Sequence, residues 1–359
     1  MPRIAVIDLG KTNKKVVVID DALAPIANRT ASFPAERDAD GIVVEPVERI
    51  ESWLISALAE LARAPGYDAI AVSAHGATWV GLDAAHTRAL PVIAYDQPLS
   101  VAEQAELDAE FRRRTGDPLR LQDETGTCDL PLLINPAKGV LWAQRRLPQA
   151  WARVRRIVWY PEWWSFRLTG ALAAEPTYAM NHAYLYDIRT QQPSSAARAL
   201  GVDGMLDCDF KPPWHAVGMV REELRRQGLP AVPVTVGVHD SNASLLPYLV
   251  QHPERDFVLN STGTWCVAMH HVDAVAYAPG ELGQQIIFNR DCFGGLNKVS
   301  ILLGGMDYAL YHGLLGGEHG ALDVARLNAS LARVDDLILP GAHAGQFPRH
   351  RGEIGRAHV

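Results

Sequence analysis

The sequence predicts an α/β protein of two domains. Its 359 residues exceed what one domain of about 100–200 residues usually holds. Apolar residues make up 48% and charged residues 21% of the chain, and these are the proportions of a globular protein. Short apolar runs typical of strands alternate with segments in which apolar residues recur at helical spacing. Because strands and helices mix throughout, the pattern favours an α/β class.

The first elements are predicted to be a β-hairpin and a long helix. Two apolar runs, Ile4–Ile7 and Lys15–Ile19, flank the polar segment Asp8–Lys14, which contains one glycine. This arrangement is typical of a hairpin. Apolar residues then recur every three or four positions along Val47–Arg63, so this segment is expected to form an amphipathic helix.

The rest of the chain continues to mix short strands and helices. Strands are expected at Ala69–Ser73, Ala77–Leu82, Ile157–Tyr160, Val232–Val238, Phe257–Leu259 and Trp265–Met269. Helices are expected at Val101–Arg114, Lys138–Arg146, Pro148–Arg153, Glu162–Leu168, Asn242–Val250, Ile301–Leu315 and Leu322–Val334. The strand–turn–strand unit around Gly10 recurs around Gly263. If each domain opens with such a hairpin, two Gly/Thr-rich turns would face each other across a cleft.

The composition excludes several classes of function. With 34 basic and 41 acidic residues the formal charge is −7, so the chain lacks the basic excess that binds nucleic acid. Clusters such as Arg112-Arg113-Arg114 are interpreted as solvated helix faces. No apolar run approaches the ~20 residues of a membrane span, and no signal-peptide pattern precedes the first strand. The widely spaced Cys128, Cys208, Cys266 and Cys292 predict free thiols in a cytoplasmic protein.

The last seven residues, Glu353–Val359, are predicted to be a non-native tail. They have no apolar period. The codons gag-atc-gga-aga-gca-cac-gtc, which would encode them, match the start of a short-read sequencing adapter apart from the first base. We therefore expect the native sequence to diverge near Arg351 or Gly352 and to be longer. A genomic stop codon directly after Val359 would instead show that these seven residues are native and that the match is due to chance.

The first polar turn has the composition of a phosphate-binding site. Asp8 directly follows an apolar strand, and a carboxylate at such a position can hold Mg²⁺ through water. Gly10 would allow the backbone to approach a ligand closely. An ordinary hairpin turn uses the same residue types, so this alternative stays open. Hydrogen-bond donors and positive charge for phosphate oxygens would come from the backbone amides, Thr12, Asn13 and Lys11 or Lys14.

Two further polar segments supply the other parts of a phosphoryl-transfer site. Ser261–Thr264 again contains hydroxyls and a glycine, and again an ordinary turn is the alternative. The chain has no GxxxxGK[ST] loop, which argues against a P-loop nucleotide site. Asp240 lies between an apolar strand and a predicted helix. It could be a helix N-cap or the general base toward a sugar hydroxyl.

The segment Ser73–Trp79 is a candidate for sugar binding. It follows a predicted strand, so His75 could bind sugar hydroxyls and Trp79 could cover a sugar face. The alternative is a capped turn with a tryptophan in the core. A hydrolase with a Ser/His/Asp triad has less support, because the chain lacks the GxSxG nucleophile elbow.

Taken together, these segments resemble the FGGY carbohydrate kinases. Ile7–Lys15 is similar to the family's first phosphate motif, and Ser73–Ala77 is similar to its sugar-site segment. Gly237–Ala243 is similar to the stretch with the catalytic base, and Ser261–Trp265 is similar to the second phosphate motif. The four motifs follow the family's order along the whole chain. The resemblance implies a two-domain actin-like ATPase (ribonuclease H-like) fold with a cleft between the domains.

The resemblance also implies ATP and Mg²⁺ as cofactors and a small sugar as substrate, with no nucleic-acid or membrane partner. It implies that Asp8 positions Mg²⁺, and that Asp240 contacts the sugar as the base that deprotonates its primary hydroxyl. Sugar contacts are further implied for His75, Gly76 and Ala77. Phosphate contacts are implied for Asp8, Gly10, Lys11, Thr12, Asn13, Thr262, Gly263 and Thr264.

The family pattern also predicts the domain organisation. Residues 1–245 are expected to form the N-terminal kinase domain, which binds sugar and phosphate. Because family members are usually longer, residues 255–352 are expected to form an incomplete C-terminal domain that lacks the adenosine-binding segment. Residues 353–359 would be the non-native tail. A homodimer is expected for the full-length protein.

The sugar is expected to be a ketose, with a 6-deoxyketohexose such as L-rhamnulose or L-fuculose as the leading candidate. Gly263-Thr264-Trp265 is more similar to rhamnulose and fuculose kinases than to xylulose or glycerol kinases, and Leu303–Met306 is similar to a later element of that subgroup. Tyr95–Pro98 stands where many relatives have an Asp-x-Arg element, so another ketose such as xylulose stays open. Two alternatives on the same fold are a catalytically silent sugar or nucleotide sensor and an actin-like or chaperone-like ATPase. A silent sensor would be expected to lose one carboxylate, and Asp8 and Asp240 are both present.

Overall fold

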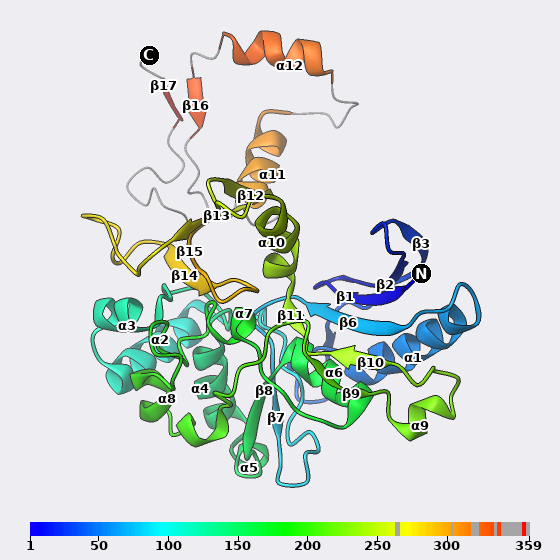
Figure 1. The fold of residues 1–359 in the computed structure, drawn as a ribbon. Coiled ribbons are helices and arrows are strands. Elements are labelled where there is room, and N and C mark those ends of the chain that lie inside the picture. The colour runs from blue at the N-terminus through cyan, green and yellow to red at the C-terminus, as the bar shows by residue number, and fades with distance from the viewer. Residues whose placement is uncertain (263–265, 303, 317–322, 334–335, 339–353, 357–359) are drawn as a thin grey trace.

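Two sheets of unequal size, with helices around them, make up the chain (Figure 1). The computed structural model describes all residues except 263–265, 303, 317–322, 334–335, 339–353 and 357–359. Three two-stranded pairs complete the strands of the described part: β4 (Glu36–Arg37) with β5 (Val43–Val44), β7 (Trp79–Leu82) with β8 (Arg156–Trp159), and β16 (Asp336–Ile338) with β17 (Ile354–Arg356). This mixture confirms the predicted α/β class.

The larger sheet has the order β3-β2-β1-β6-β10-β9, and β11 also pairs with β6. Its core strands β1, β6, β10 and β11 are parallel, whereas β2, β3 and β9 pair antiparallel with their neighbours. The strands are β1 (Ile4–Leu9), β2 (Asn13–Ile19), β3 (Pro25–Ser32), β6 (Ala69–Ala74), β9 (Ala216–Met219), β10 (Pro233–Thr235) and β11 (Val238–His239).

Alternation along β2 places a lysine in the core. Successive side chains of a strand point to opposite faces, so Lys14 shares the buried face of β2 with Val16 and Val18. A buried ammonium needs partners. The Nζ of Lys14 donates to the carbonyl oxygens of Gly10 and Lys11, at 2.6 and 2.9 Å. Through these two hydrogen bonds Lys14 fixes the backbone of the first polar turn from the core side.

Helices and loops pack around the larger sheet and extend to one side of it (Figure 1). The predicted long helix is α1 (Val47–Arg63), whose buried face is apolar. The others in this part of the chain are α2 (Val101–Thr115), α3 (Pro118–Thr125), α4 (Pro136–Arg146), α5 (Pro148–Trp151), α6 (Tyr160–Thr169), α7 (Pro176–Ala179), α8 (Ser195–Ala199), α9 (Glu222–Arg225) and the 3-10 turn η1 (Asp203–Met205).

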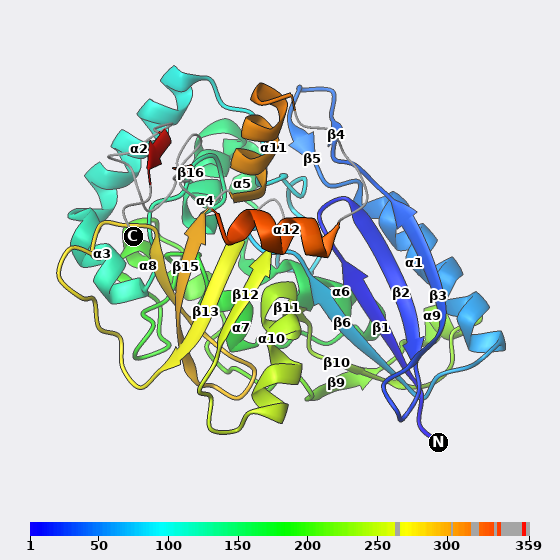
Figure 2. The same cartoon turned by 90° about the horizontal axis from the view of Figure 1, so that it is seen from above.

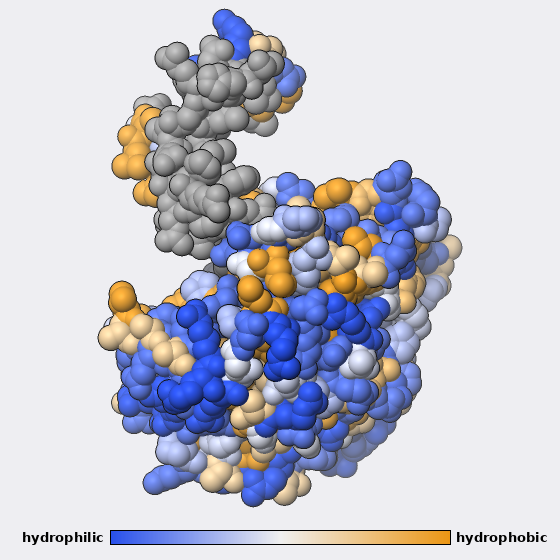
Figure 3. All heavy atoms as spheres, turned by 90° about the vertical axis from the view of Figure 1, so that its left-hand side faces the viewer, coloured by the Kyte–Doolittle hydropathy of each residue, from blue (hydrophilic) through white to orange (hydrophobic). Residues whose placement is uncertain are grey.

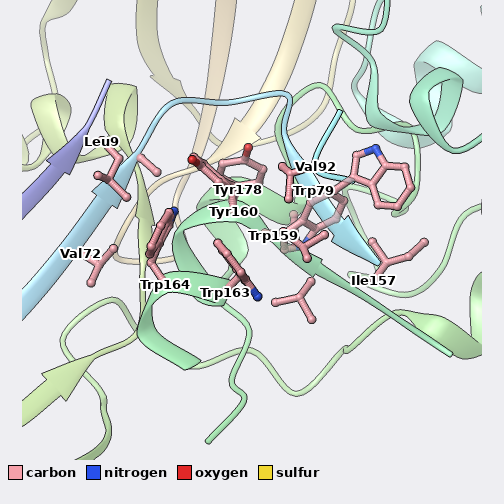
Figure 4. Close-up of a cluster of buried hydrophobic side chains, with 14 of the residues drawn as sticks. Leu9, Val72, Trp79, Val92, Ile157, Trp159, Tyr160, Trp163, Trp164 and Tyr178 are labelled. Atoms are coloured by element: carbon pink, nitrogen blue, oxygen red, sulfur yellow. The ribbon is translucent and has the colours of Figure 1, made fainter. Parts of the chain in front are cut away.

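Aromatic side chains of α6 form a rigid layer against the sheet. Trp163 and Trp164 lie with their ring centroids 4.7 Å apart, and the ring of Tyr160 is 5.8 Å from that of Trp164. Figure 4 shows these rings in one cluster with Leu9 of β1 and Val72 of β6. Protein interiors packed in this way resist deformation, so the ends of β1 and β6 have a firm support.

The smaller sheet is antiparallel, in the order β12-β13-β15-β14. Seen from above, it and the larger sheet lie on either side of α10 (Figure 2). Its elements and the helices after it are α10 (Asp240–Gln251), β12 (Val258–Thr262), β13 (Cys266–Val272), β14 (Ile286–Arg290), β15 (Leu296–Leu302), α11 (Gly304–Leu314) and α12 (Val324–Leu331).

The smaller sheet follows α10 along the chain, and it is also attached to α3 through the buried amide of Gln122. Its Nε2 donates to the carbonyl oxygens of Gln284 and Ile286 at 3.0 and 2.9 Å. Its Oε1 accepts from the N–H of Gly283 at 2.8 Å. Two of these hydrogen bonds reach the segment that leads into β14, and the third reaches its first residue.

Most predicted elements differ from the structure by a few residues at their ends, and two differ more clearly. The apolar run Val232–Val238 is interrupted between β10 and β11. At the interruption the backbone of Gly237 passes so close to Pro161 that a Cβ would lie 2.3 Å from its carbonyl carbon. The strand therefore bends where it meets α6. The predicted helix Ile301–Leu315 begins too early, since Ile301 and Leu302 complete β15. Apolar residues at a strand–helix junction extend the helical pattern across it.

The surface agrees with the charge pattern of the sequence. The side that carries α2 and α3 is mostly hydrophilic over the body of the molecule (Figure 3), and Arg113 and Arg114 there pair with Glu110. This confirms the interpretation of the arginine cluster as a solvated helix face.

All four cysteines are free, as predicted. Within the described residues, none of the helices has the length and apolar character needed to cross a bilayer.

Candidate active site

A pocket of about 350 Å³ lies between the larger sheet and the smaller one. One side carries polar and small residues, and the opposite side carries aliphatic residues. The polar side is lined by Lys11, His75, Gly76, Ala77, Tyr95, Asn181, His182, His239, Asp240 and Ser241. The aliphatic side, with one polar residue, is lined by Leu130, Ile134, Val267, Met269, Ile287, Asn289, Val299 and Ile301.

Parallel pairing of three strands brings the candidate residues together. In the sheet register, Leu9 of β1 and His239 of β11 both lie opposite Ala74 of β6. The chain then leaves the sheet at the same edge after each strand. The first polar turn, the His75-Gly76 segment and Asp240 therefore meet around one site. Carboxyl ends of parallel strands are the usual binding edge of α/β proteins.

Asp240 is the first residue of α10, and its side chain keeps 37% exposure toward the pocket. Its Oδ1 accepts from the N–H of Ser241 at 2.6 Å and lies 3.2 Å from Nδ1 of His239. Burial raises the pKa of Asp240, while the neighbouring His75 and the bonds from Ser241 act to lower it. The N-cap of α10 is His239, so Asp240 is not needed for that role.

Asp8, at the end of β1, is the second carboxylate of the site. Burial is the main reason that its pKa is raised, and the negative charge of Asp240 raises it further. Lys15 and Lys14 act in the opposite direction. The two aspartates are therefore close enough to repel each other. A bound cation between them would relieve this repulsion.

Lys11 is held by acidic partners. Its Nζ lies 2.7 Å from Oε1 of Glu45 and 2.8 Å from Oδ1 of Asp96, and 4.6 Å from the ring centre of Tyr95. The other oxygen of Glu45 is 4.0 Å from Nζ of Lys14. In this arrangement the positive charge of Lys11 is already balanced where it borders the pocket.

Two histidines offer unpartnered ring nitrogens at the pocket. Nδ1 of His239 accepts from the N–H of Ser241, at 3.1 Å, so the neutral ring carries its proton on Nε2. Nδ1 of His75 lies 3.0 Å from the carbonyl oxygen of Gly76, so this ring donates there and its Nε2 is an acceptor. Both Nε2 atoms are buried without a partner among the described residues. Within the described structure, one is therefore a donor and the other an acceptor without a partner, in residues that line the pocket.

Gly76 is required by the packing of two imidazole rings. A Cβ at this position would lie 2.4 Å from Nε2 of His239 and 2.8 Å from Cε1 of His182. Their ring centroids are 5.9 Å apart. Burial lowers the pKa of His182 to about 3 and that of His239 to about 4. The pocket therefore holds neutral imidazoles at physiological pH.

The sequence model of the FGGY family of carbohydrate kinases, N-terminal domain, matches residues 3–247. The chain belongs to the FGGY family of carbohydrate kinases. It is therefore a phosphotransferase that acts on a sugar with ATP, as the motifs predict.

Solved structures agree with this family assignment. A carbohydrate kinase from Novosphingobium aromaticivorans is 25% identical with a TM-score of 0.81, covering 100% of this chain and 76% of that chain. Xylulose kinases from Rhodospirillum rubrum (18% identity, TM-score 0.80, covering 99% of this chain and 73% of that chain) and Lactobacillus acidophilus (15%, 0.77, 100% and 73%) share the fold. No curated protein sequence matches. These similarities confirm the predicted actin-like ATPase fold.

The predicted second phosphate motif of this FGGY kinase lies partly outside the described residues, because Gly263, Thr264 and the following Trp265 are not among them. Thr262 ends β12 and is exposed. In the first motif, Thr12 and Asn13 are also exposed, and a Cβ on Gly10 would lie 3.1 Å from the carbonyl oxygen of Asn13.

Of the two interpretations of Trp79, the tryptophan in the core is confirmed, and the indole does not cover a sugar face. Its indole is buried in the core, with its ring centroid 6.1 Å from that of Trp151. The reason is that β7 leaves the larger sheet and pairs with β8. The first residue of β7 therefore packs over Gly139 of α4, within the buried hydrophobic cluster (Figure 4), and it does not line the pocket.

Two residues that line the pocket of the kinase, Asn181 and His182, were not predicted from the sequence. They follow α7, and their segment has neither the periodicity nor the glycine-rich pattern that identified the other motifs. Tyr95, which also lines the pocket, belongs to the Tyr95–Pro98 segment that was compared with the family's Asp-x-Arg element. The polar dipeptide Asn181-His182 between apolar neighbours was the one available signal.

Stability should depend on pH through His182. Below pH 6.5 the unfolded chain binds a proton on this residue, whereas the folded protein does not until about pH 3. The unfolded state thus binds more protons, so the free energy of unfolding falls as the pH falls. Below pH 6.5, the free energy of unfolding of the wild type should fall by about 1.4 kcal/mol more per pH unit than that of His182→Gln. Urea unfolding of both proteins at pH 7, 6 and 5 measures this, and parallel pH profiles would contradict it.

Proposed function

We propose that this kinase transfers the γ-phosphoryl group of ATP to the primary hydroxyl of a ketose, with Asp240 as the general base. The observation that carries the proposal is the strand register, because it gathers Asp8, the His75-Gly76 segment and Asp240 at one edge of the sheet. Phosphoryl transfer needs these parts: a carboxylate at the attacking hydroxyl, groups that bind the polyphosphate and a site for a cation.

Asp240 is suited to accept the hydroxyl proton. Oδ1 is engaged by Ser241, while Oδ2 makes no hydrogen bond to any described residue and is open to the substrate. Burial raises its pKa toward the working pH, which makes a carboxylate a more effective base. The unpartnered Nε2 atoms of His75 and His239 would orient the sugar by its hydroxyls.

Asp8 is proposed to hold Mg²⁺, and the residues fit such a cation. The mutual repulsion of Asp8 and Asp240 is the charge pattern that a divalent ion stabilises. No group of three or more potential metal ligands exists in the described part of the chain, which agrees with an ion held mainly by water and phosphate oxygens. When bound, Mg²⁺ would balance charge on the polyphosphate. The turns at Gly10–Asn13 and Thr262–Thr264 are proposed to contact the phosphates.

The pocket favours a neutral, partly apolar sugar. Its histidines are neutral, and the charge of Lys11 is balanced by Glu45 and Asp96, so it offers no free cation to an acidic sugar within the described lining. Aliphatic side chains such as Met269 and Ile287 form the opposite wall. A sugar methyl group would bury favourably there. We therefore propose a 6-deoxyketohexose such as L-rhamnulose or L-fuculose, phosphorylated at C1 in the cytoplasm.

A panel of sugars tests the proposal. Sugar-dependent ADP release by the full-length enzyme is measured with L-rhamnulose, L-fuculose, D-xylulose, glycerol and gluconate. The 6-deoxyketoses should give the highest kcat/KM and a 1-phosphate product. A preference for D-xylulose would support a ketose kinase but contradict the proposed contact between the aliphatic wall and a sugar methyl group. Preference for glycerol or gluconate would overturn the ketose assignment, and absence of turnover with tight sugar binding would favour the sensor.

A further inference from the structure

The short helix α7 forms hydrogen bonds with two parts of the site, the end of β11 and the His75–Thr78 turn. It follows Glu175, whose carboxylate accepts from the backbone N–H groups of Thr177 and Tyr178 at 2.8 and 2.9 Å. The N–H of Glu175 is itself bound by the buried carboxylate of Glu162, at 2.8 Å. Every residue named here is buried. The helix is therefore fixed firmly to the core.

Thr177 connects this helix to the strand that carries the base. Its hydroxyl donates to Oε1 of Glu175 at 2.6 Å, and it accepts from the backbone N–H of His239 at 3.2 Å. His239 directly precedes Asp240. The proton of the hydroxyl and one of its lone pairs are thus aligned by groups on either side. The bond fixes the end of β11 at the residue before the carboxylate.

Tyr178 connects the same helix to the sugar-site segment. Its hydroxyl oxygen accepts from the N–H of Thr78 at 2.8 Å. Its proton is shared between the carbonyl oxygens of Thr78 and His75, at 2.7 and 3.0 Å. The two bonds span the His75–Thr78 turn, in which Ala77 adopts a left-handed φ of 66°. The ring also packs against His239, with centroids 5.3 Å apart.

We propose that Thr177 and Tyr178 are positioning residues for phosphoryl transfer, because they hold the Asp240 strand end and the His75–Thr78 turn in one fixed relation. This inference rests on the proposed role of Asp240. Neither hydroxyl lines the pocket, so both act through the residues that they bind. Errors of about 1 Å in the placement of reacting groups can cost ~10²-fold in rate.

Thr177→Val tests the link to the base. It keeps the side-chain shape and removes the hydroxyl, so kcat should fall about 10- to 100-fold while KM for ATP changes by less than about twofold. Thr177→Ser restores the hydroxyl and should restore kcat. The matched control is Thr115→Val in α2, which removes another buried hydroxyl, bound to the carbonyl of Phe111. We expect this control to lose about as much thermal stability as Thr177→Val while its kcat stays unchanged.

Tyr178→Phe tests the link to the sugar segment independently. KM for the sugar should rise about tenfold, because the His75–Thr78 turn loses its bridge. Tyr186→Phe is the control, since it removes a buried hydroxyl bound to the carbonyl of Asp207. Unchanged kinetics in both Thr177→Val and Tyr178→Phe, or equal losses in the controls, would overturn the inference. If Asp240→Asn retains full turnover, the proposed function fails first, so the two failures are distinguishable.

Discussion

Replacing Asp240 with asparagine should lower turnover with the sugar by about 10²–10⁴-fold. The amide keeps the size of the side chain and an oxygen that can accept from Ser241, but it cannot take a proton from the attacking hydroxyl. Sugar binding should therefore change little. Steady-state kinetics of ADP release give kcat, and calorimetric titration gives the sugar affinity.

The matched control for this substitution is Asp209→Asn. Asp209 is an exposed carboxylate that pairs with Lys211, so its loss should not affect turnover. The pH dependence adds a second check, because the raised pKa of Asp240 places the acid limb of kcat/KM above the range of an ordinary aspartate. Turnover near the wild-type value in Asp240→Asn would show that another group removes the proton.

Gly76→Ala should lower kcat/KM for the sugar by about 100-fold or more. The added methyl would lie 2.4 Å from Nε2 of His239 and 2.8 Å from Cε1 of His182. His239 is buried and His182 is partly buried, so the rings cannot move apart freely without displacing their neighbours. The proposed hydroxyl donor on His239 would be the first contact to shift. KM for ATP should be affected less.

Gly204→Ala provides the matched control for the added methyl group. A Cβ at Gly204 meets no atom within 4 Å, and the backbone there is not left-handed. Its kinetics and thermal unfolding should equal those of the wild type. If Gly76→Ala also leaves sugar kinetics unchanged, the two imidazoles do not form part of the sugar site.

Long periodic elements and strand-end motifs could be predicted from the sequence, because their signals are local. The helix Val47–Arg63 was predicted with the bounds observed, since its apolar spacing is continuous. The position of Asp240 after a strand was also evident. Thr177 and His182 could not be found in this way, because their importance comes from hydrogen bonds and packing with residues about 60 to 100 positions away. The sequence left two places open for Trp79 for a related reason, because only the pairing of β7 with β8 decides which side its indole faces.

The attachment of the smaller sheet through Gln122 has a mechanical consequence. This sheet continues covalently from α10, and hydrogen bonds from the helical part also hold it along β14. They are those of the Gln122 amide, one from the N–H of Phe288 to the carbonyl oxygen of Gly126, and one from Arg290 to the carbonyl oxygen of Ile188. Because these bonds lie along β14, we expect the β14 edge of the aliphatic wall to keep its place whenever the pocket opens or closes.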